Sequence, residues 1–83
     1  MKLHKVFVRA MWDPEAKVWV ATSGDVPGLV AEAATERELL RKLKVLVPEL
    51  LEENGLLAKN APAEIELVLR SRREAKVRLK RAA

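Results

Sequence analysis

The sequence predicts a single α+β domain, a two-layer sandwich in which one amphipathic helix covers one face of a sheet. Three short strand-like segments come first, a helix with a wide leucine and valine stripe follows, and an alternating segment comes after the helix. A sheet and a helix bury their apolar faces against each other, so the expected order is β-β-β-α-β with an antiparallel meander. The 83 residues form one domain, 1–83, in which 73–83 are a basic C-terminal strand or tail.

Composition limits the class of protein. The chain has no cysteine, which excludes disulfides and thiolate metal sites and is compatible with the cytoplasmic location that we expect. Residues 1–5 are followed by strand-like alternation and not by a continuous apolar stretch, so we predict no signal peptide. No apolar run approaches about 20 residues, so we predict no membrane span. The chain has no Gln and two Asn among many Arg and Glu residues, which leans toward a heat-adapted source.

The first strand is expected at residues 2–12. From residue 6 onward its even-numbered side chains are small and apolar, apart from a tryptophan, and should lie under the helix. Its odd-numbered side chains mix Lys5 and Arg9 with large apolar residues. A half-apolar face of this kind is often covered by another subunit. We therefore predict an oligomer interface that uses Phe7, Met11 and Trp12.

A turn and a returning strand are expected next. Residues 13–17 begin with Asp-Pro, which suits a type I turn in which the Asp13 carboxylate accepts a backbone N–H. Residues 18–23 are rich in β-branched and aromatic side chains and too few for a stable helix, so they are predicted to form the second strand.

A loop at 24–28 is punctuated by glycine and proline. Gly24 and Gly28 can take positive φ, and Pro27 cannot donate to a strand ladder. A short third strand at 29–33, antiparallel to the second, completes the meander.

One long helix is expected from Thr35 to about Asn54. Thr35 and Glu38 form a capping box, in which the hydroxyl accepts the N–H of residue 38 and the carboxylate reaches back. Leucine and valine recur at helical spacing, and Gly55 is a natural stop. Pro48 lies inside this pattern and predicts a kink, at roughly 3 kcal/mol in a regular helix. The alternative is two helices.

The chain returns to strand character after the helix. A connector at 56–62 leads to a half-buried strand at 63–72, where apolar and charged residues alternate. A turn is then a candidate at 71–76. The alternation at 77–80 permits either a short fifth strand or a frayed basic tail.

No residue pattern points to catalysis, a metal or a cofactor, so we predict that the protein is not an enzyme. His4 is the single histidine and has no nucleophile, base or second ligand nearby in sequence. The segment from Gly24 to Gly28 lacks the Lys-Ser/Thr of a phosphate-binding loop. Four acids would bind Mg²⁺ if they converged at strand ends, but turns and strand positions explain them better: Asp13, Glu15, Asp25 and Glu32.

The strongest electrostatic feature is a basic run near the C-terminus. Residues 70–81 carry seven basic residues and one acid, whereas residues 1–69 carry nine and eleven. Such runs bind phosphate backbones through counterion release, yet no aromatic residue interleaves with this one, so no stacking platform is expected. The simplest interpretation of this basic run is that it forms a solvated strand edge or tail. Contacts with an acidic partner or with nucleic acid would use Arg70, Arg72, Arg73, Lys76 and Arg78.

The segment from the second strand into the helix resembles the HicB-like antitoxin domains. An x-Val-Ala strand, here Trp19-Val20-Ala21, runs into a loop that ends Asp25-Val26-Pro27-Gly28. A short strand follows, and then Thr35 and Glu38 open an amphipathic helix with leucine pairs. The similarity covers about residues 3–55.

The resemblance implies both a fold and a partner class. It implies β-β-β-α-β topology, homodimers or higher oligomers, and, in true antitoxins, binding to a small ribonuclease toxin, HicA, whose active site is covered. The C-terminal ribbon-helix-helix or helix-turn-helix module that typical HicB antitoxins use on operator DNA is not predicted here. The resemblance is therefore to a short form or to an uncharacterised relative.

These observations lead to one expected function and two alternatives. We expect a non-enzymatic protein-interaction domain, a likeness of the HicB-like antitoxins, that forms a dimer and binds a protein partner such as a small toxin. The first alternative is a nucleic-acid-binding module that uses the basic C-terminal segment. The second is a structural or oligomerisation domain. No cofactor and no membrane partner are expected.

Overall fold

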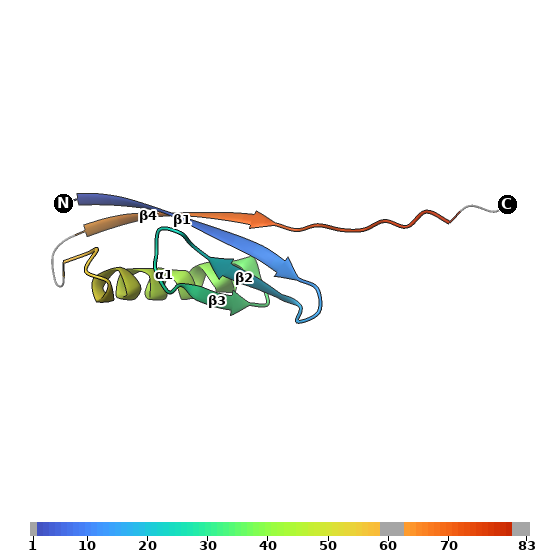
Figure 1. Ribbon diagram of the computed structural model, residues 1–83, viewed down its shortest axis with the longest axis horizontal. Helices are drawn as coiled ribbons and strands as arrows, with labels where there is room; N and C mark the ends of the chain where they lie inside the picture. Colours follow the sequence, from blue (N-terminus) through green and yellow to red (C-terminus); the bar gives the residue numbers. More distant parts are fainter. Residues whose placement is uncertain (1, 59–62, 81–83) are drawn as a thin grey trace.

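The structure, a computed structural model, describes residues 2–58 and 63–80 and has four strands and one helix in the predicted order (Figure 1). Residues 59–62 of the predicted connector and 81–83 of the predicted basic segment lie outside the described residues. The elements are β1 (Lys2–Asp13), β2 (Val18–Thr22), β3 (Val30–Ala33), α1 (Glu36–Glu53) and β4 (Ala63–Arg72). The predicted α+β class and the predicted succession of elements are confirmed.

The four strands form one mixed sheet in the order β3-β2-β1-β4. β1 pairs with β2, and β2 with β3, in antiparallel fashion, as predicted for the meander. β4 runs parallel to β1, with Phe7 opposite Val68 and Arg9 opposite Arg70. The parallel pairing follows because the α1 connection carries the chain back along the sheet before β4 begins.

The helix α1 lies along one face of the sheet (Figure 1) and begins and ends where the sequence predicts. Thr35 is its N-cap, and the Glu38 N–H donates to Thr35 Oγ1 at 3.1 Å. The helix continues through Pro48, so the alternative with two helices is wrong. Asn54 is the C-cap, and Gly55 follows with φ of 71°, a left-handed conformation that ends the helix.

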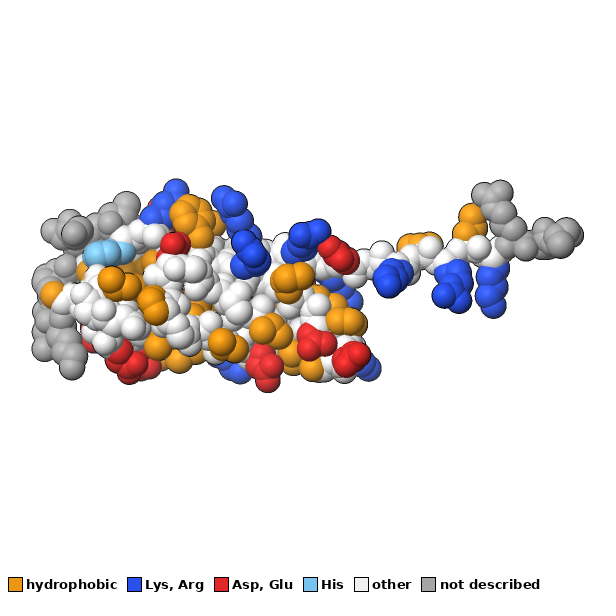
Figure 2. Space-filling view, in the orientation of Figure 1, with side chains coloured by type: hydrophobic (Ala, Val, Ile, Leu, Met, Phe, Trp, Pro, Cys, Tyr) orange, Lys and Arg blue, Asp and Glu red, His pale blue; other side chains and the backbone are white. Residues whose placement is uncertain are grey.

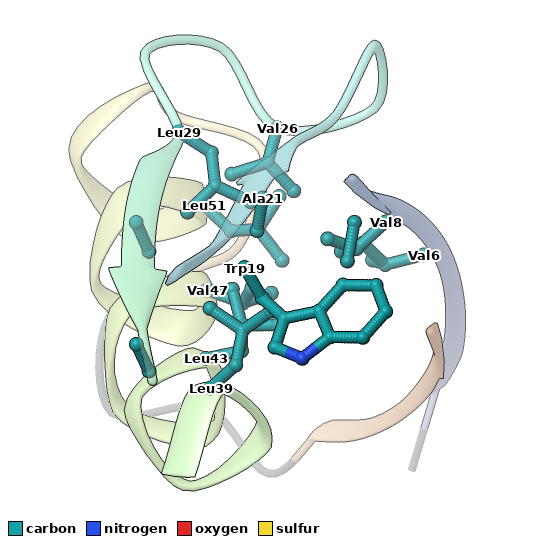
Figure 3. Close-up of a cluster of buried hydrophobic side chains, with 13 residues drawn as sticks. Val6, Val8, Trp19, Ala21, Val26, Leu29, Leu39, Leu43, Val47 and Leu51 are labelled. Carbon is teal, nitrogen blue, oxygen red and sulfur yellow. The ribbon is translucent and has the colours of Figure 1, made fainter. Parts of the chain in front are cut away.

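The hydrophobic core lies between α1 and the inner face of the sheet. Val6, Val8 and Ala10 of β1 are buried there, as the alternation of β1 predicts. Trp19 of β2 joins them as a buried aromatic residue. Figure 3 shows the α1 side chains that point toward these strands: Leu39, Leu43, Val47 and Leu51.

The turn after β1 is held by its own aspartate, as predicted. Asp13 Oδ1 accepts the backbone N–H of Glu15 at 3.0 Å and that of Ala16 at 3.2 Å. Lys17 closes the turn with φ of 57° and donates its N–H to the Asp13 carbonyl. The Asp13 carboxylate therefore has a structural task.

Residues 73–80 continue β4 as a straight, extended segment (Figure 1). The predicted turn at 71–76 is wrong, because Ser71 and Arg72 still pair with β1 and the chain runs on without reversing. Among the described residues, 73–80 pair with no strand, so the tail alternative holds and no fifth strand forms within the chain. The molecule is accordingly elongated, 68 × 20 × 19 Å.

Candidate interaction surface

The outer face of the sheet points away from α1, and no helix or strand of residues 2–58 and 63–80 covers it (Figure 1). Phe7 and Met11 of β1 lie on this face with 42% and 47% of their area exposed. The register sets Phe7 beside Val68 of β4 and Met11 beside Val20 of β2. Two apolar pairs, Phe7–Val68 and Met11–Val20, therefore lie on an open surface with the row of Arg9 between them, and we call them together the apolar strip.

Cations border this strip. Lys5 Nζ lies 5.5 Å and Arg70 Cζ 5.3 Å from the centre of the Phe7 ring, within the reach of a cation–π contact. Arg9 lies opposite Arg70 in the parallel ladder, and Met11 lies opposite Arg72. Figure 2 shows Lys and Arg side chains around hydrophobic ones along β1 and β4. We use the term outer patch for the residues Lys5, Phe7, Arg9, Met11, Arg70 and Arg72.

Aromatic side chains accompany the basic run in space, although none does so in sequence. Arg70 lies over Phe7, and Arg73 Cζ lies 4.5 Å from the centre of the Trp12 ring. The basic run holds no aromatic residue of its own, but the fold brings Phe7 and Trp12 of β1 beside it. The alternation of residues 63–72 predicts a strand. The sequences of β1 and β4 do not indicate that these two strands pair in parallel, and this pairing brings the residues together.

The three residues predicted for an oligomer interface lie on two faces. Phe7 and Met11 share the outer patch. Trp12 lies on the inner side, partly buried, and meets Trp19 edge to face with ring centres 5.4 Å apart. The three side chains do not form one surface, and their part in an oligomer stays a prediction.

The residues predicted for partner contacts are also divided. Arg70 and Arg72 belong to the outer patch on β4. Lys76 and Arg78 lie beyond it, fully on the extended segment 73–80, and are exposed. Arg73 lies between the two groups, against Trp12.

The loop before β3 is tied to β1. The Phe7 N–H donates to Asp25 Oδ2 at 2.9 Å, and Ser23 Oγ donates to the Phe7 carbonyl at 2.6 Å. The Asp25 N–H in turn donates to Ser23 Oγ at 3.1 Å. These bonds replace the strand ladder at Phe7, where pairing with β2 has ended. Asp25 of the Asp-x-Pro-Gly motif therefore has a structural role.

The rest of that loop packs against the core and the end of α1. Val26 is fully buried, and Asn54 Nδ2 donates to the Pro27 carbonyl at 3.3 Å. Gly28 has φ of 81°, as predicted. Gly24 does not take positive φ.

The residues considered for catalysis or metal binding do not lie close together. Among residues 2–58 and 63–80, no group of three His, Asp or Glu side chains is placed to hold a metal ion. His4 is half-buried on β1, opposite Ile65, and Glu15 and Glu32 are exposed on separate elements. In the described part of the chain, α1 is too polar to cross a membrane.

A shallow groove of about 100 Å³ lies between α1 and β4 on the inner side of the sheet. We refer to it as the α1–β4 groove. Its walls are aliphatic apart from one lysine: Leu43, Lys44, Val47, Pro48, Ile65 and Leu67. Ile65 and Leu67 are only partly buried beside it.

Comparison with known proteins identifies relatives without a described activity. The family model for a domain of unknown function, DUF1902, matches residues 5–79. A hypothetical protein from the extremely thermophilic bacterium Thermus thermophilus, known from its crystal structure, is 55% identical, with a TM-score of 0.73 over 89% of this chain and 100% of that chain. No curated protein matches. The family match extends through the extended segment as far as residue 79.

Proposed function

We propose that this chain, which belongs to the DUF1902 family, is a non-enzymatic protein-interaction domain whose outer patch binds an acidic protein surface. One observation carries the proposal: Phe7 and Met11 are exposed on an open sheet face and bordered by cations. Aromatic, methionine and arginine side chains are enriched at protein interfaces. Side chains of this kind in the centre of an interface contribute most of its binding energy.

The charge of the outer patch suggests the chemistry of the partner. Lys5, Arg9, Arg70 and Arg72 contribute four positive charges around the apolar strip. Glu66 lies opposite Lys5 at one end of the patch. A partner with an apolar centre and surrounding carboxylates would therefore be steered to this face and oriented on it.

The resemblance to HicB-like antitoxins adds a class of partner to this proposal, a small ribonuclease toxin. The outer patch would then bind an acidic and apolar surface of the toxin beside its RNA-binding face, because a face that binds phosphates is itself basic. The patch predicts that the toxin presents acidic and apolar residues at the contact, since opposite charges across an interface favour association.

Co-purification from the organism that encodes the chain tests this function. A tagged wild-type chain is compared with Phe7→Ser/Met11→Ser, which removes the apolar strip. Val45→Ser is the matched control, because Val45 is also exposed, at 59%, but lies on α1. We expect the same acidic partner with the wild type and the control and at least about tenfold less with the double variant. Equal recovery by all three chains would contradict the proposal.

A second candidate function is single-stranded nucleic-acid binding. It is supported by the contact of Arg70 and Lys5 with the exposed Phe7 ring, which combines a stacking surface with cations for phosphates. The two functions differ in their dependence on salt, because phosphate contacts release counterions.

A further inference from the structure

The segment after β4 keeps the alternation of a strand. Arg72 and Glu74 lie on one side of the chain, since their side chains form an ion pair of 2.7 Å. Arg73 lies on the other side, against the Trp12 ring on the inner side of the sheet. Even-numbered residues therefore continue the outer face, and odd-numbered residues continue the inner face.

The remainder of this segment is an amphipathic strand without a layer to cover it. Val77 and Leu79 are 91% and 69% exposed, and they alternate with cations at positions 76, 78 and 80. Figure 2 shows the projecting segment with basic side chains along one side and hydrophobic ones along the other. Apolar residues in such a strand are buried only when another chain pairs with it.

β4 has an unpaired edge with which a strand of this kind can pair. It is the last strand of the sheet and pairs with β1 on one side only, so its other side is unpaired in the described chain. Its inner side chains Ile65 and Leu67 line the α1–β4 groove, which is open beside them. A strand added at this edge would bring its own inner side chains to the groove.

We propose that residues 73–80 pair antiparallel with β4 of a second copy of this chain, about a two-fold axis at Arg72. Each copy then gives its segment to the other, as a self-complementary two-fold interface requires. On the outer face this register sets opposite charges across the ladder: Glu64 faces Lys80 of the second copy, Glu66 faces Arg78, and Arg70 faces Glu74.

The same register pairs apolar residues on the inner face. Val77 of the second copy lies opposite Leu67, and Leu79 lies opposite Ile65. Both are then adjacent to the α1–β4 groove, whose aliphatic walls match them. At the axis the two Arg72 side chains meet, and each retains its own Glu74 at 2.7 Å, which offsets the like charges.

Neighbouring registers lack this match. Moving the axis from Arg72 to residue 73 sets Arg70 opposite Lys76, and moving it to residue 71 sets Arg70 opposite Arg72. Like charges directly opposite destabilise a strand pair. A shift of the pairing by one residue would exchange the inner and outer faces of the added strand. Charge and apolar pattern thus select one register.

Cysteine cross-linking of the full chain tests the register directly, since the natural sequence has no cysteine. Glu66→Cys/Arg78→Cys places two thiols opposite each other between copies. Within one copy the same two positions are about 40 Å apart along an extended strand, far beyond the 4.4–6.8 Å Cα separation of a disulfide. We expect a covalent dimer after oxidation. The control Glu66→Cys/Val77→Cys puts the second thiol on the other face, and we expect at least about tenfold less cross-linking.

Sedimentation equilibrium provides a second measurement with charge-reversed variants. Glu66→Arg and Arg78→Glu each place like charges opposite one another twice in the dimer, and we expect the dissociation constant to rise about tenfold. The combination of both variants exchanges the charges and should restore the wild-type value. A wild-type chain that stays monomeric, equal cross-linking of the control pair, or single variants without effect would overturn the proposal.

The proposed pairing shares Arg70 and Arg72 with the outer patch but does not use its apolar side chains. It uses the edge of β4 and the segment 73–80, whereas the partner is proposed to contact Phe7 and Met11. Phe7→Ser/Met11→Ser should therefore leave the dissociation constant of the dimer within about twofold of the wild type, because β4 lies between these two side chains and the added strand.

Discussion

The backbone N–H of Phe7 donates a hydrogen bond to the Asp25 carboxylate, 2.9 Å away, where β2 no longer pairs with β1. The aspartate thus takes the place of a strand partner, and the adjacent Ser23 hydroxyl binds the Phe7 carbonyl. The Asp-x-Pro-Gly motif therefore positions the residue at the centre of the outer patch. In the proposed function, the motif would act through the backbone, by fixing the position of Phe7.

Removing this carboxylate should loosen the loop and β1 together. We expect Asp25→Ala to lower the free energy of unfolding by about 1–2 kcal/mol, since it removes a charge-assisted hydrogen bond to a backbone N–H. Asp25→Asn keeps an acceptor and should cost less than half as much. Urea denaturation followed by circular dichroism measures both, and equal losses for the two variants would contradict the assignment.

Val26 anchors the same loop in the core. Its side chain is fully buried although it belongs to no strand or helix. Val26→Ala should lower the free energy of unfolding by about 2 kcal/mol through lost burial and a cavity. Val30→Ala is the control, because Val30 is 71% exposed and should change stability by less than about 0.5 kcal/mol. Similar values in thermal denaturation would show that the loop does not pack as described.

Alanine substitutions at the two loop glycines measure the cost of backbone strain without any steric contact. Gly28 has φ of 81°, Gly24 lies outside the left-handed region, and an added Cβ would meet no atom within 4 Å at either. Gly28→Ala should therefore cost about 1–2 kcal/mol from backbone strain alone. Gly24→Ala should be within about 0.5 kcal/mol of the wild type. Denaturant titrations of the two variants test this, and a larger loss for Gly24→Ala would contradict it.

Fluorescence anisotropy with a labelled single-stranded oligonucleotide tests the second candidate function. Binding should weaken steeply with salt, and Arg70→Gln should reduce the slope of log K against log salt by about one. Phe7→Ala should weaken binding by about 1–3 kcal/mol at constant salt, because it removes a stacking surface. Arg41→Gln on α1 is the control and should leave the slope unchanged. Failure to bind at low salt would exclude this function.

Local chemistry explains what could be predicted from the sequence. The capping pair Thr35 and Glu38 and the stop at Gly55 define α1, because short-range hydrogen bonds and glycine conformation determine helix ends. The alternation in β1 correctly separates buried Val8 from exposed Phe7. These features depend on neighbours within a few residues.

Long-range pairing explains what could not be predicted. The sequence of residues 63–72 does not indicate that they pair in parallel with β1, so the contact of Arg70 with Phe7 could not be predicted. The bond from Phe7 to Asp25 was missed for the same reason, since it joins positions brought together by the fold. The candidate turn at 71–76 does not form, because Ser71 and Arg72 continue to pair with β1 and the chain runs on extended.

The two edges of the sheet differ in length and accessibility, and this difference would limit the size of the assembly proposed above. β3 has four residues, and its Glu32 carbonyl already accepts a hydrogen bond from Lys42 Nζ at 2.7 Å. β4 has ten residues and an unpaired side among the described residues. Short edges with lysine resist further strand addition. In the proposed pairing, growth through β4 would therefore stop after one addition, and the sheet would form a closed pair in place of a fibre.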